Sequence, residues 1–333
     1  MNNNFNLFGI DIGGTKIVIS LGTSAGKILG SKRIPSHGRG PDEVIPELFA
    51  AGHQLLEEAG ITTEQLRAIG IGAPAPADIP NGILTAPVNN PKWRNVPISE
   101  LMANEFNTET FFDNDANAGV LAEWLFGAGI GGTNVVYLTL STGIGGGIIA
   151  NGKLIRGNNF FAGEMGHICL DPNGPQCSCG MQGCYEAFCG GVAVAKRVQT
   201  ELVDQPEHPI VKYAGGEIAK IDMIAIEKAV RDGNSYAVNL WEELSLRHAQ
   251  AIGAIINIFN PDKIILGTMA WATGALFMEP LMKHLPNYCW SQMLDNCTVV
   301  PSKLERSIGD YAGLAVALNY LYEAGDYQLL TRD

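Results

Sequence analysis

Basic residues are scarce in this chain. Lysine and arginine together number 22, against 34 aspartates and glutamates, so the formal net charge at pH 7 is −12. Nucleic acids and anionic membranes bind basic protein surfaces, and this balance therefore argues against either partner. It does not argue against a small anionic ligand that local backbone N–H groups would hold.

Long apolar runs and low-complexity segments are also missing. No run approaches the ~18–20 residues that cross a bilayer. The N-terminal Met-Asn-Asn-Asn has no basic stretch of the kind that opens a secretory signal. We therefore expect a soluble, cytoplasmic protein. A hydrophobic share of 46% excludes a disordered chain, and 333 residues predict two domains at ~100–200 residues each.

Cysteines are few and odd in number, which makes a disulfide framework a poor explanation of them. Three of the seven, Cys177, Cys179 and Cys184, lie within eight positions, and His167 precedes them. Three thiolates and one imidazole match a closed tetrahedral zinc site, which would be structural because no position remains for water. The alternative is a set of unliganded thiols. We expect the remaining four to be small core residues: Cys169, Cys189, Cys289 and Cys297.

Glycine, in contrast, is abundant at 40 residues, and it is concentrated in two turns. The sequence DIGGTK follows the predicted strand 5–10, and STGIGGG follows the predicted strand 135–140. Adjacent glycines let the backbone approach a phosphate with its N–H groups exposed. The first turn lacks the Walker spacing, and it is followed by a strand where a dinucleotide-binding turn is followed by a helix. Each of the two turns could also be an ordinary hairpin turn. The candidate phosphate-binding residues are Gly13, Gly14, Thr15, Lys16, Thr142, Gly143 and Gly145, and Asp11 could hold a divalent cation, directly or through water.

Hydrophobic periodicity predicts an α/β chain in two halves, each opening with a strand, a Gly-rich turn and a strand. The expected strands are 5–10, 17–20, 27–34, 67–74, 110–112, 135–140 and 263–267, and 147–155 is expected to be a return hairpin with Asn151-Gly152 as its turn. The expected helices are 41–59, 116–126, 186–202, 220–231, 234–258, 274–284 and 309–323. We predict a first domain over 1–120, joined by the C-terminal helix 309–325, and a second, larger domain over 121–308.

Several carboxylates lie beside these motifs. Asp115 follows Asn114 where a predicted strand meets a predicted helix, so it could accept a proton from a hydroxyl, or the pair could simply cap the helix. Glu164 lies three residues before His167, and Glu186 lies two after Cys184. These two acids could bond vicinal sugar hydroxyls, or they could be solvated acids on a surface loop.

These motifs together resemble one known family. DIGGTK, DNDANA, STGIGGG and GEMGHICLDPNGPQCSCGMQGCYE, in this order, are similar to the ROK family of sugar kinases and sugar-responsive repressors, over about residues 7–322. The resemblance implies an actin-like, hexokinase-type pair of α/β domains with an ATP cleft and a zinc-bound loop. It also implies a homodimer or homotetramer.

The resemblance implies a role for each matching residue. Asp115 would be the catalytic base, and Asn114, Glu164, His167 and Glu186 would bind the sugar. His167 would also bind the zinc ion with Cys177, Cys179 and Cys184. The two Gly-rich turns would hold the phosphates of ATP with Mg²⁺, and Gly267, at the end of the strand Ile265-Leu266-Gly267, would lie near adenosine.

The chain departs from the family pattern at four places. They are Thr268-Met269-Ala270 in place of further glycines, Ser141 in place of glycine, Pro74-Ala75-Pro76-Ala77, and Phe160 with Phe161. We expect an ATP-dependent kinase that phosphorylates glucose at the 6-hydroxyl, with the two phenylalanines crowding an acetamido group. N-acetylmannosamine, N-acetylglucosamine or fructose kinases are the alternatives, and a repressor without its DNA-binding domain is the remote one, because only ten residues precede Asp11.

Overall fold

The computed structural model describes residues 4–87 and 91–328 and divides the chain into two compact units. Unit 1 comprises residues 1–133, 147–162 and 303–333, and unit 2 comprises 134–146 and 163–302. The first three residues of the N-terminal Met-Asn-Asn-Asn discussed above lie outside the described residues. Among the helices of the described ranges, none combines the length and the hydropathy that a membrane span requires.

Unit 1 contains a five-stranded mixed sheet with the strand order β3-β2-β1-β4-β7. Neighbours β1, β2 and β3 are antiparallel, as the short Gly turns predict, whereas β4 pairs in parallel with both β1 and β7. The strands of unit 1 are β1 (Asn6–Ile12), β2 (Lys16–Thr23), β3 (Ile28–Pro35), β4 (Leu66–Ala73), β5 (Ala77–Asp78), β6 (Ile83–Leu84), β7 (Thr110–Asn114) and β10 (Lys153–Leu154), of which β5, β6 and β10 lie outside the five-stranded sheet. Its helices are α1 (Pro41–Ala59), α2 (Ile98–Phe106), α3 (Asp115–Phe126) and α12 (Ile308–Glu323).

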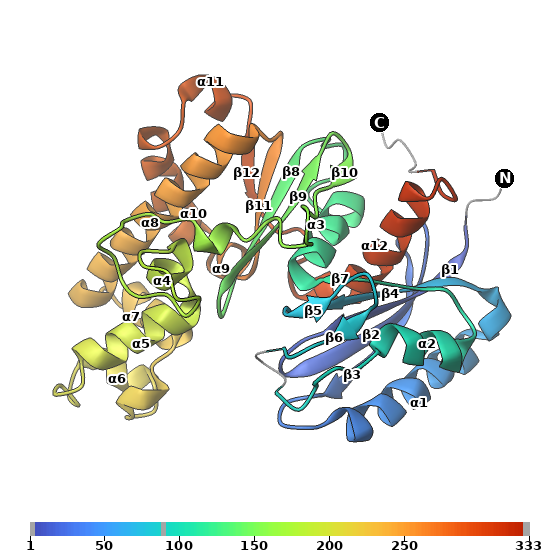
Figure 1. The fold of residues 1–333 in the computed structure, drawn as a ribbon. Coiled ribbons are helices and arrows are strands. Elements are labelled where there is room, and N and C mark those ends of the chain that lie inside the picture. Colours follow the sequence, from blue (N-terminus) through green and yellow to red (C-terminus); the bar gives the residue numbers. More distant parts are fainter. Residues whose placement is uncertain (1–3, 88–90, 329–333) are drawn as a thin grey trace. The chain divides into compact units, whose positions relative to one another are not determined.

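Helices cover both faces of this sheet (Figure 1). Phe8 and Ile10 of β1 belong to a core cluster with Leu48 of α1 and Phe106 of α2. The neighbouring Leu7 points to the opposite face, where α12 and the chain end form a second cluster. Because successive side chains of a strand alternate between faces, the near-continuous apolar sequence of β1 serves both cores.

Glycines let α12 lie directly on the sheet. A Cβ atom on Gly70 of β4 would lie 2.1 Å from the carbonyl oxygen of Gly313 in α12. A Cβ atom on Gly9 of β1 would lie 2.5 Å from the backbone nitrogen of Leu314. The C-terminal helix therefore belongs to unit 1. Residues 147–162, which we had predicted in the second domain, are also part of unit 1.

Unit 2 contains three parallel strands, with β11 between β8 and β12. Strand β9 (Ile144–Ala150) starts in unit 2 beside β8 and ends in unit 1, where it pairs with β10. The other strands are β8 (Val135–Leu140), β11 (Lys263–Leu266) and β12 (Thr298–Pro301). The helices are α4 (Tyr185–Cys189), α5 (Gly191–Glu201), α6 (Pro209–Tyr213), α7 (Met223–Arg231), α8 (Ser235–Phe259), α9 (Thr268–Thr273), α10 (Ala275–His284) and α11 (Ser291–Leu294).

One predicted helix was wrong in its continuity. The periodicity predicted a single helix over 186–202, but α4 ends at Cys189 and α5 begins at Gly191. Gly190 between them has an extended backbone (φ −63°, ψ 136°). The N–H of Gly191 donates to the carbonyl of Ser141 at 2.9 Å, so the interruption places the start of α5 against the second Gly-rich turn.

The sequence analysis also missed short elements. We did not predict α2, α6, α9, α11 or β12.

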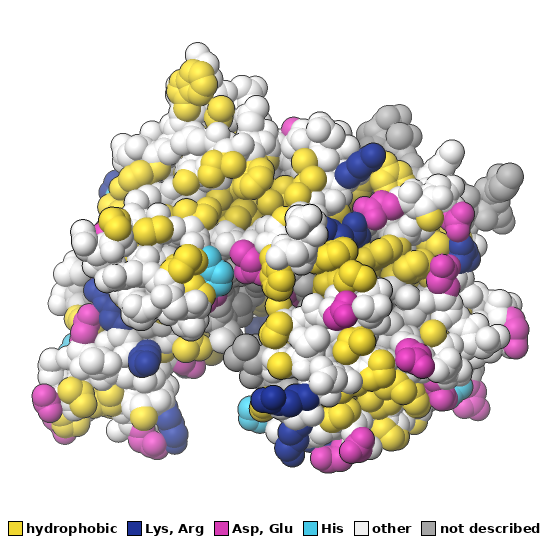
Figure 2. Space-filling model, viewed as in Figure 1, with side chains coloured by type: hydrophobic (Ala, Val, Ile, Leu, Met, Phe, Trp, Pro, Cys, Tyr) yellow, Lys and Arg dark blue, Asp and Glu magenta, His cyan; other side chains and the backbone are white. Residues whose placement is uncertain are grey.

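On the face drawn in Figure 2, lysine and arginine side chains lie singly or in small groups beside acidic ones.

Candidate functional site

The predicted base lies where β7 meets α3. Asn114 ends the strand and caps the helix, because its Oδ1 accepts from the backbone N–H of Asn117 at 2.7 Å. The capping role that we weighed for this residue is therefore confirmed. Asn114 is only 8% exposed, whereas Asp115 in the first turn of α3 is exposed. The carboxylate of Asp115 is accessible to a hydroxyl group, as a general base requires.

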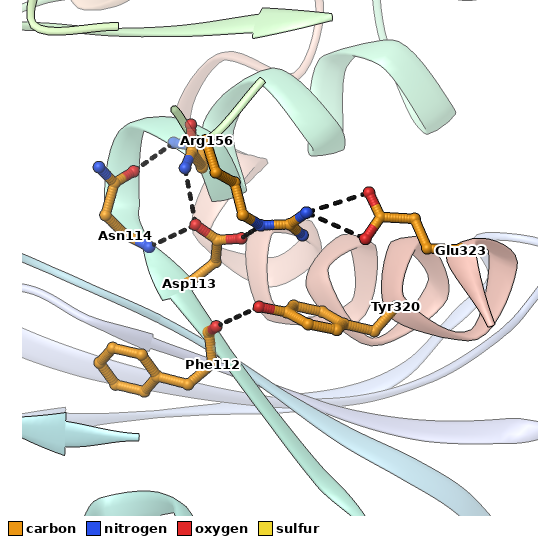
Figure 3. Close-up of polar contacts among 7 residues, drawn as sticks. Phe112, Asp113, Asn114, Arg156, Tyr320 and Glu323 are labelled. Carbon is orange, nitrogen blue, oxygen red and sulfur yellow. Dashed lines mark hydrogen bonds and ion pairs between the residues drawn. The ribbon is translucent and has the colours of Figure 1, made fainter. Parts of the chain in front are cut away.

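A buried ionic network lies directly behind this junction (Figure 3). Asp113 is fully buried, and its carboxylate accepts three hydrogen bonds, from Asn114 N at 2.9 Å, Asn117 Nδ2 at 2.7 Å and Arg156 Nε at 2.8 Å. Burial raises the pKa of Asp113 above its ordinary value, and Arg156 opposes this shift. Nη1 of Arg156 also bonds both carboxylate oxygens of Glu323 in α12, at 2.9 and 3.0 Å.

The first Gly-rich turn connects β1 and β2 in unit 1. Gly13 N donates to the carbonyl of Lys16 at 3.0 Å. Behind the turn, Ser36 donates its N–H to Thr15 O and its hydroxyl to Gly13 O, both at 3.0 Å. Thr15 and Lys16 are exposed. These contacts hold the turn through its carbonyls and leave a hydroxyl and an ammonium group accessible beside it.

Asp11 lies at the base of this turn and has a perturbed pKa. Burial, followed by the charge of Asp115, raises the pKa of Asp11 to about 7, and Lys16 opposes the shift. The sheet places these residues near each other, because Gly72 of β4 pairs with Asp11 of β1 on one side and with Asp113 of β7 on the other, two residues before Asp115. A Cβ atom on Gly309, in the first turn of α12, would lie 2.7 Å from Asp11 Oδ2, so that helix terminus lies close to the carboxylate.

The second Gly-rich turn connects β8 and β9, and Glu186 supports it within unit 2. The N–H of Ile144 donates to Glu186 Oε2 at 2.8 Å. A Cβ atom on Gly143 would lie 2.5 Å from the same oxygen. Val192 N, at the start of α5, bonds Thr142 O at 3.0 Å. Glu186, which we had assigned to the sugar, thus also has a contact that orients this turn.

The predicted metal ligands come together in unit 2. One donor atom each from His167, Cys177, Cys179 and Cys184 lies within 4.8 Å of all the others. His167 Nδ1 is 3.8 Å from Cys177 Sγ, and the sulfurs of Cys179 and Cys184 are 3.7 Å apart. A Cys₃His donor set of this compactness suits a tetrahedral metal ion. Burial and the neighbouring thiols raise the pKa of Cys184 to about 12.

The loop that carries these ligands is shaped by its own backbone. Cys177 N bonds Met181 O at 2.8 Å, and Leu170 N bonds Gly183 O at 2.8 Å. Gly183 has φ +74°, and a Cβ atom there would lie 1.6 Å from the carbonyl oxygen of Asp171, so only glycine fits. The loop leads into α4, which carries Glu186, while Glu164 precedes the 3₁₀ turn Met165–His167 and is exposed.

Unit 2 also contains a cavity of about 350 Å³ next to the second turn. Thr142 of that turn contributes to its lining, as do Thr268 and Met269, which follow Gly267. Apolar side chains line much of the cavity, among them Trp241 and Met223. Its size and apolar character suit a flat organic ring such as a nucleoside base.

Comparison with known proteins identifies the family. The ROK family matches residues 7–319. The chain belongs to the ROK family. A glucokinase of Thermotoga maritima is 34% identical over 91% of this chain and 94% of its own length. A xylose repressor of Caldicellulosiruptor bescii is 30% identical over 90% of this chain and 74% of its own length.

Solved ROK structures have the same fold. A ROK hexokinase from Thermus thermophilus has a TM-score of 0.81 at 28% identity and covers 96% of this chain and 100% of its own. A ROK family glucokinase from Streptomyces griseus, solved in complex with glucose and AMPPNP, has a TM-score of 0.77 at 28% identity and covers 94% of this chain and 99% of its own. The predicted α/β fold and the predicted family are confirmed.

The structure brings the predicted residues together in two groups, one in each unit. Asp11, the first turn, Asn114 and Asp115 are in unit 1, and the second turn, Glu164, Glu186, Gly267 and the Cys₃His cluster are in unit 2. Sequence reasoning missed Asp113 and Arg156, whose contact joins positions 43 residues apart. Phe160 packs against the core of unit 1 and Phe161 is 49% exposed. Their expected crowding of an acetamido group stays a prediction.

Proposed function

We propose that this chain is an ATP-dependent hexose kinase that phosphorylates glucose at the 6-hydroxyl. The observation that carries the proposal is that β4 pairs with the ends of both β1 and β7, so the first Gly-rich turn after Asp11 and the junction that carries the exposed Asp115 lie at the same edge of the sheet in unit 1. A general base and a phosphate-binding turn side by side are what phosphoryl transfer to an alcohol needs. Membership of the ROK family and the similarity to glucokinases support the same reaction.

The proposed reaction assigns a role to each group of residues. Asp115 removes the proton of the 6-hydroxyl as that oxygen attacks the γ-phosphorus of ATP. Asn114 bonds the same sugar through its amide nitrogen, because its amide oxygen caps α3. Bound at Asp11, Mg²⁺ would offset the negative charge of the phosphates. ADP leaves as the phosphate ester forms, and the hydroxyl proton remains on Asp115.

The second Gly-rich turn and the cavity beside it are assigned to the nucleotide. Thr142 lines this cavity and is part of the turn, so one ligand could place its ring in the cavity and its phosphates at the turn. Gly267 directly follows β11, and its N–H donates to the carbonyl of Leu138 in β8 at 2.8 Å. We place the adenine of ATP there, with Thr268 and Met269 against it in place of the glycines of many family members.

The Cys₃His cluster is assigned to one structural Zn²⁺ ion. The four donor atoms and the preformed backbone of the loop fit that ion. Zinc supplies order to a loop that has little apolar surface to bury. His167 would use Nδ1 for the metal and its other nitrogen for a sugar hydroxyl, and Glu164 and Glu186 would accept hydrogen bonds from neighbouring hydroxyls.

The test of the proposed function is a coupled ADP-release assay over glucose, mannose, fructose, N-acetylglucosamine and N-acetylmannosamine. We expect glucose to have the highest kcat/KM. A higher kcat/KM with an acetylated sugar would make that sugar the substrate, and the assignment as a sugar kinase would stand. Sugar binding measured by calorimetry without ADP release from any sugar would favour a sensor, the class to which the repressor relatives belong.

A further inference from the structure

We propose that Arg156 is a positioning residue for phosphoryl transfer: by holding the buried carboxylate of Asp113, it fixes the backbone that presents Asn114 and Asp115 to the sugar. This inference rests on the proposed kinase function. It concerns contacts within unit 1 only, and Figure 3 shows them.

Asp113 directly contacts the junction between β7 and α3. Asp113 Oδ1 accepts from the backbone N–H of Asn114 and from the side chain of Asn117, one turn into α3. The same Asn117 donates its backbone N–H to Asn114 Oδ1. Asn114, one residue before Asp115, and Asn117, two residues after it, are therefore both bonded to the same carboxylate oxygen of Asp113. A shift of that carboxylate would turn the first residue of α3.

Arg156 holds the remaining carboxylate oxygen of Asp113. Oδ2 accepts from Arg156 Nε at 2.8 Å. The guanidinium is fixed in turn, because its Nη1 bonds Glu323 of α12 and its carbon lies 4.6 Å from the ring centre of Tyr320. Tyr320 donates its hydroxyl to the carbonyl of Phe112 at 3.0 Å, one residue before Asp113. Arg156 thus braces β7 against α12 just behind the base.

The buried ion pair between Arg156 and Asp113 is poorly explained by a contribution to folding stability alone. Asp113 is fully buried and the Arg156 side chain is only 14% exposed, so both charges have lost most of their water. Buried ion pairs often contribute no more than well-packed apolar side chains of the same size, because desolvation offsets their attraction. Arg156 Nη2 is buried and has no hydrogen-bond partner among the described residues. The ion pair provides directional hydrogen bonds to the junction, which apolar groups would not provide.

Backbone hydrogen bonds around Arg156 also hold this residue in place. Ile155 N bonds Ile148 O at 2.9 Å, and Ala162 N bonds Arg156 O at 3.1 Å. The segment 147–162 is therefore closed on itself at Arg156 before the chain enters unit 2 at Gly163. Arg156 is consequently held in place through its backbone as well as its side chain.

The experiment compares Arg156→Met with a matched control, Arg67→Met. Arg67 also bridges two acids in unit 1, Glu109 at 3.1 Å and Asp326 at 2.6 Å, but it lies at the opposite end of β4 from the junction. We expect Arg156→Met to lower kcat with glucose by about 10- to 100-fold, the loss typical of a misplaced reacting group. The KM for ATP should stay unchanged, and Arg67→Met should retain wild-type kcat.

The decisive readout is the same substitution in an Asp115→Asn background. If Arg156 acts through the base, Arg156→Met should lower kcat little further there. A merely structural role would lower the active fraction equally in both backgrounds, so the two losses would multiply. If Arg156→Met does not fold, Arg156→Lys carries the same comparison with the charge retained.

The outcomes separate this inference from the function beneath it. Wild-type kcat in Arg156→Met, or losses that multiply with Asp115→Asn, would overturn the inference alone. Absence of sugar-dependent ADP release in the wild-type chain would overturn the proposed function, and the inference with it.

Discussion

Asp11→Asn should stabilise the protein while inactivating it. The pKa of Asp11 is raised from 3.8 to about 7 by burial and by Asp115. Between about pH 4 and pH 7 the folded protein therefore keeps a proton that the unfolded chain has lost. Because the folded state binds more protons in this window, the free energy of unfolding falls as the pH rises through it and levels off above about pH 7.

The size of the effect follows from the shift. About three pK units at ~1.4 kcal/mol each give an upper limit of roughly 4 kcal/mol. The side chain of Asp11 is partly exposed, so solvent screening reduces this to the order of 1–3 kcal/mol. Asparagine is neutral at every pH, and Asp11→Asn should therefore be more stable than wild type by this amount at pH 8 and nearly equal to it at pH 4.

The measurement is urea unfolding of both proteins at pH 4, 5, 6, 7 and 8, together with kcat and KM for ATP at pH 8. Activity should fall because the proposed cation ligand is lost. Asp204→Asn, on an exposed segment of unit 2, changes the net charge equally and should alter neither quantity. A stability difference between wild type and Asp11→Asn that does not grow with pH would refute the reasoning.

Three further predictions test other parts of the molecule. Cys179→Ser should remove bound zinc, lower the melting temperature and raise the KM for glucose, whereas protein purified without chelator that contains no zinc by elemental analysis would contradict the assignment. Gly70→Ala should reduce the free energy of unfolding by about 1–3 kcal/mol, because its Cβ would overlap Gly313 of α12, while Gly40→Ala, with its nearest neighbour 3.8 Å away, should cost little in urea unfolding. Ala272→Trp should fill the 350 Å³ cavity and raise the KM for ATP by about tenfold or more, the equivalent of ~1.4 kcal/mol. An unchanged KM for ATP would mean that the adenine ring binds elsewhere.

Local signals made much of the fold predictable. The bounds of α1 match the predicted 41–59 because Pro41 and early acids mark its start and Gly60, in the left-handed conformation, marks its end. The two Gly-rich turns and the cysteine spacing are equally local. Each of these signals lies within a few residues of the feature it specifies, so one sequence is enough to read it.

Other features depend on contacts between distant residues. Gly190 interrupts a periodic helix because the adjacent Gly191 bonds Ser141, about 50 positions away. The Arg156–Asp113–Glu323 network joins three separate segments, and nothing in the sequence near Asp113 indicates its partners. Residues 147–162 continue an apparent hairpin of the second half, yet they belong to unit 1. Local periodicity contains no information on such pairings.

The central claim is that Asp115 accepts the proton of the glucose 6-hydroxyl while the γ-phosphoryl group passes directly from ATP to that oxygen. ³¹P NMR of the reaction products tests this claim most directly. Wild-type protein with ATP, Mg²⁺ and glucose should yield glucose 6-phosphate and ADP in equal amounts. Asp115→Asn should bind glucose in calorimetry but form the product about 10²–10⁴-fold more slowly, the usual loss on removing a general base. Absence of a sugar phosphate with wild-type protein, or a near wild-type rate with Asp115→Asn, would contradict the account.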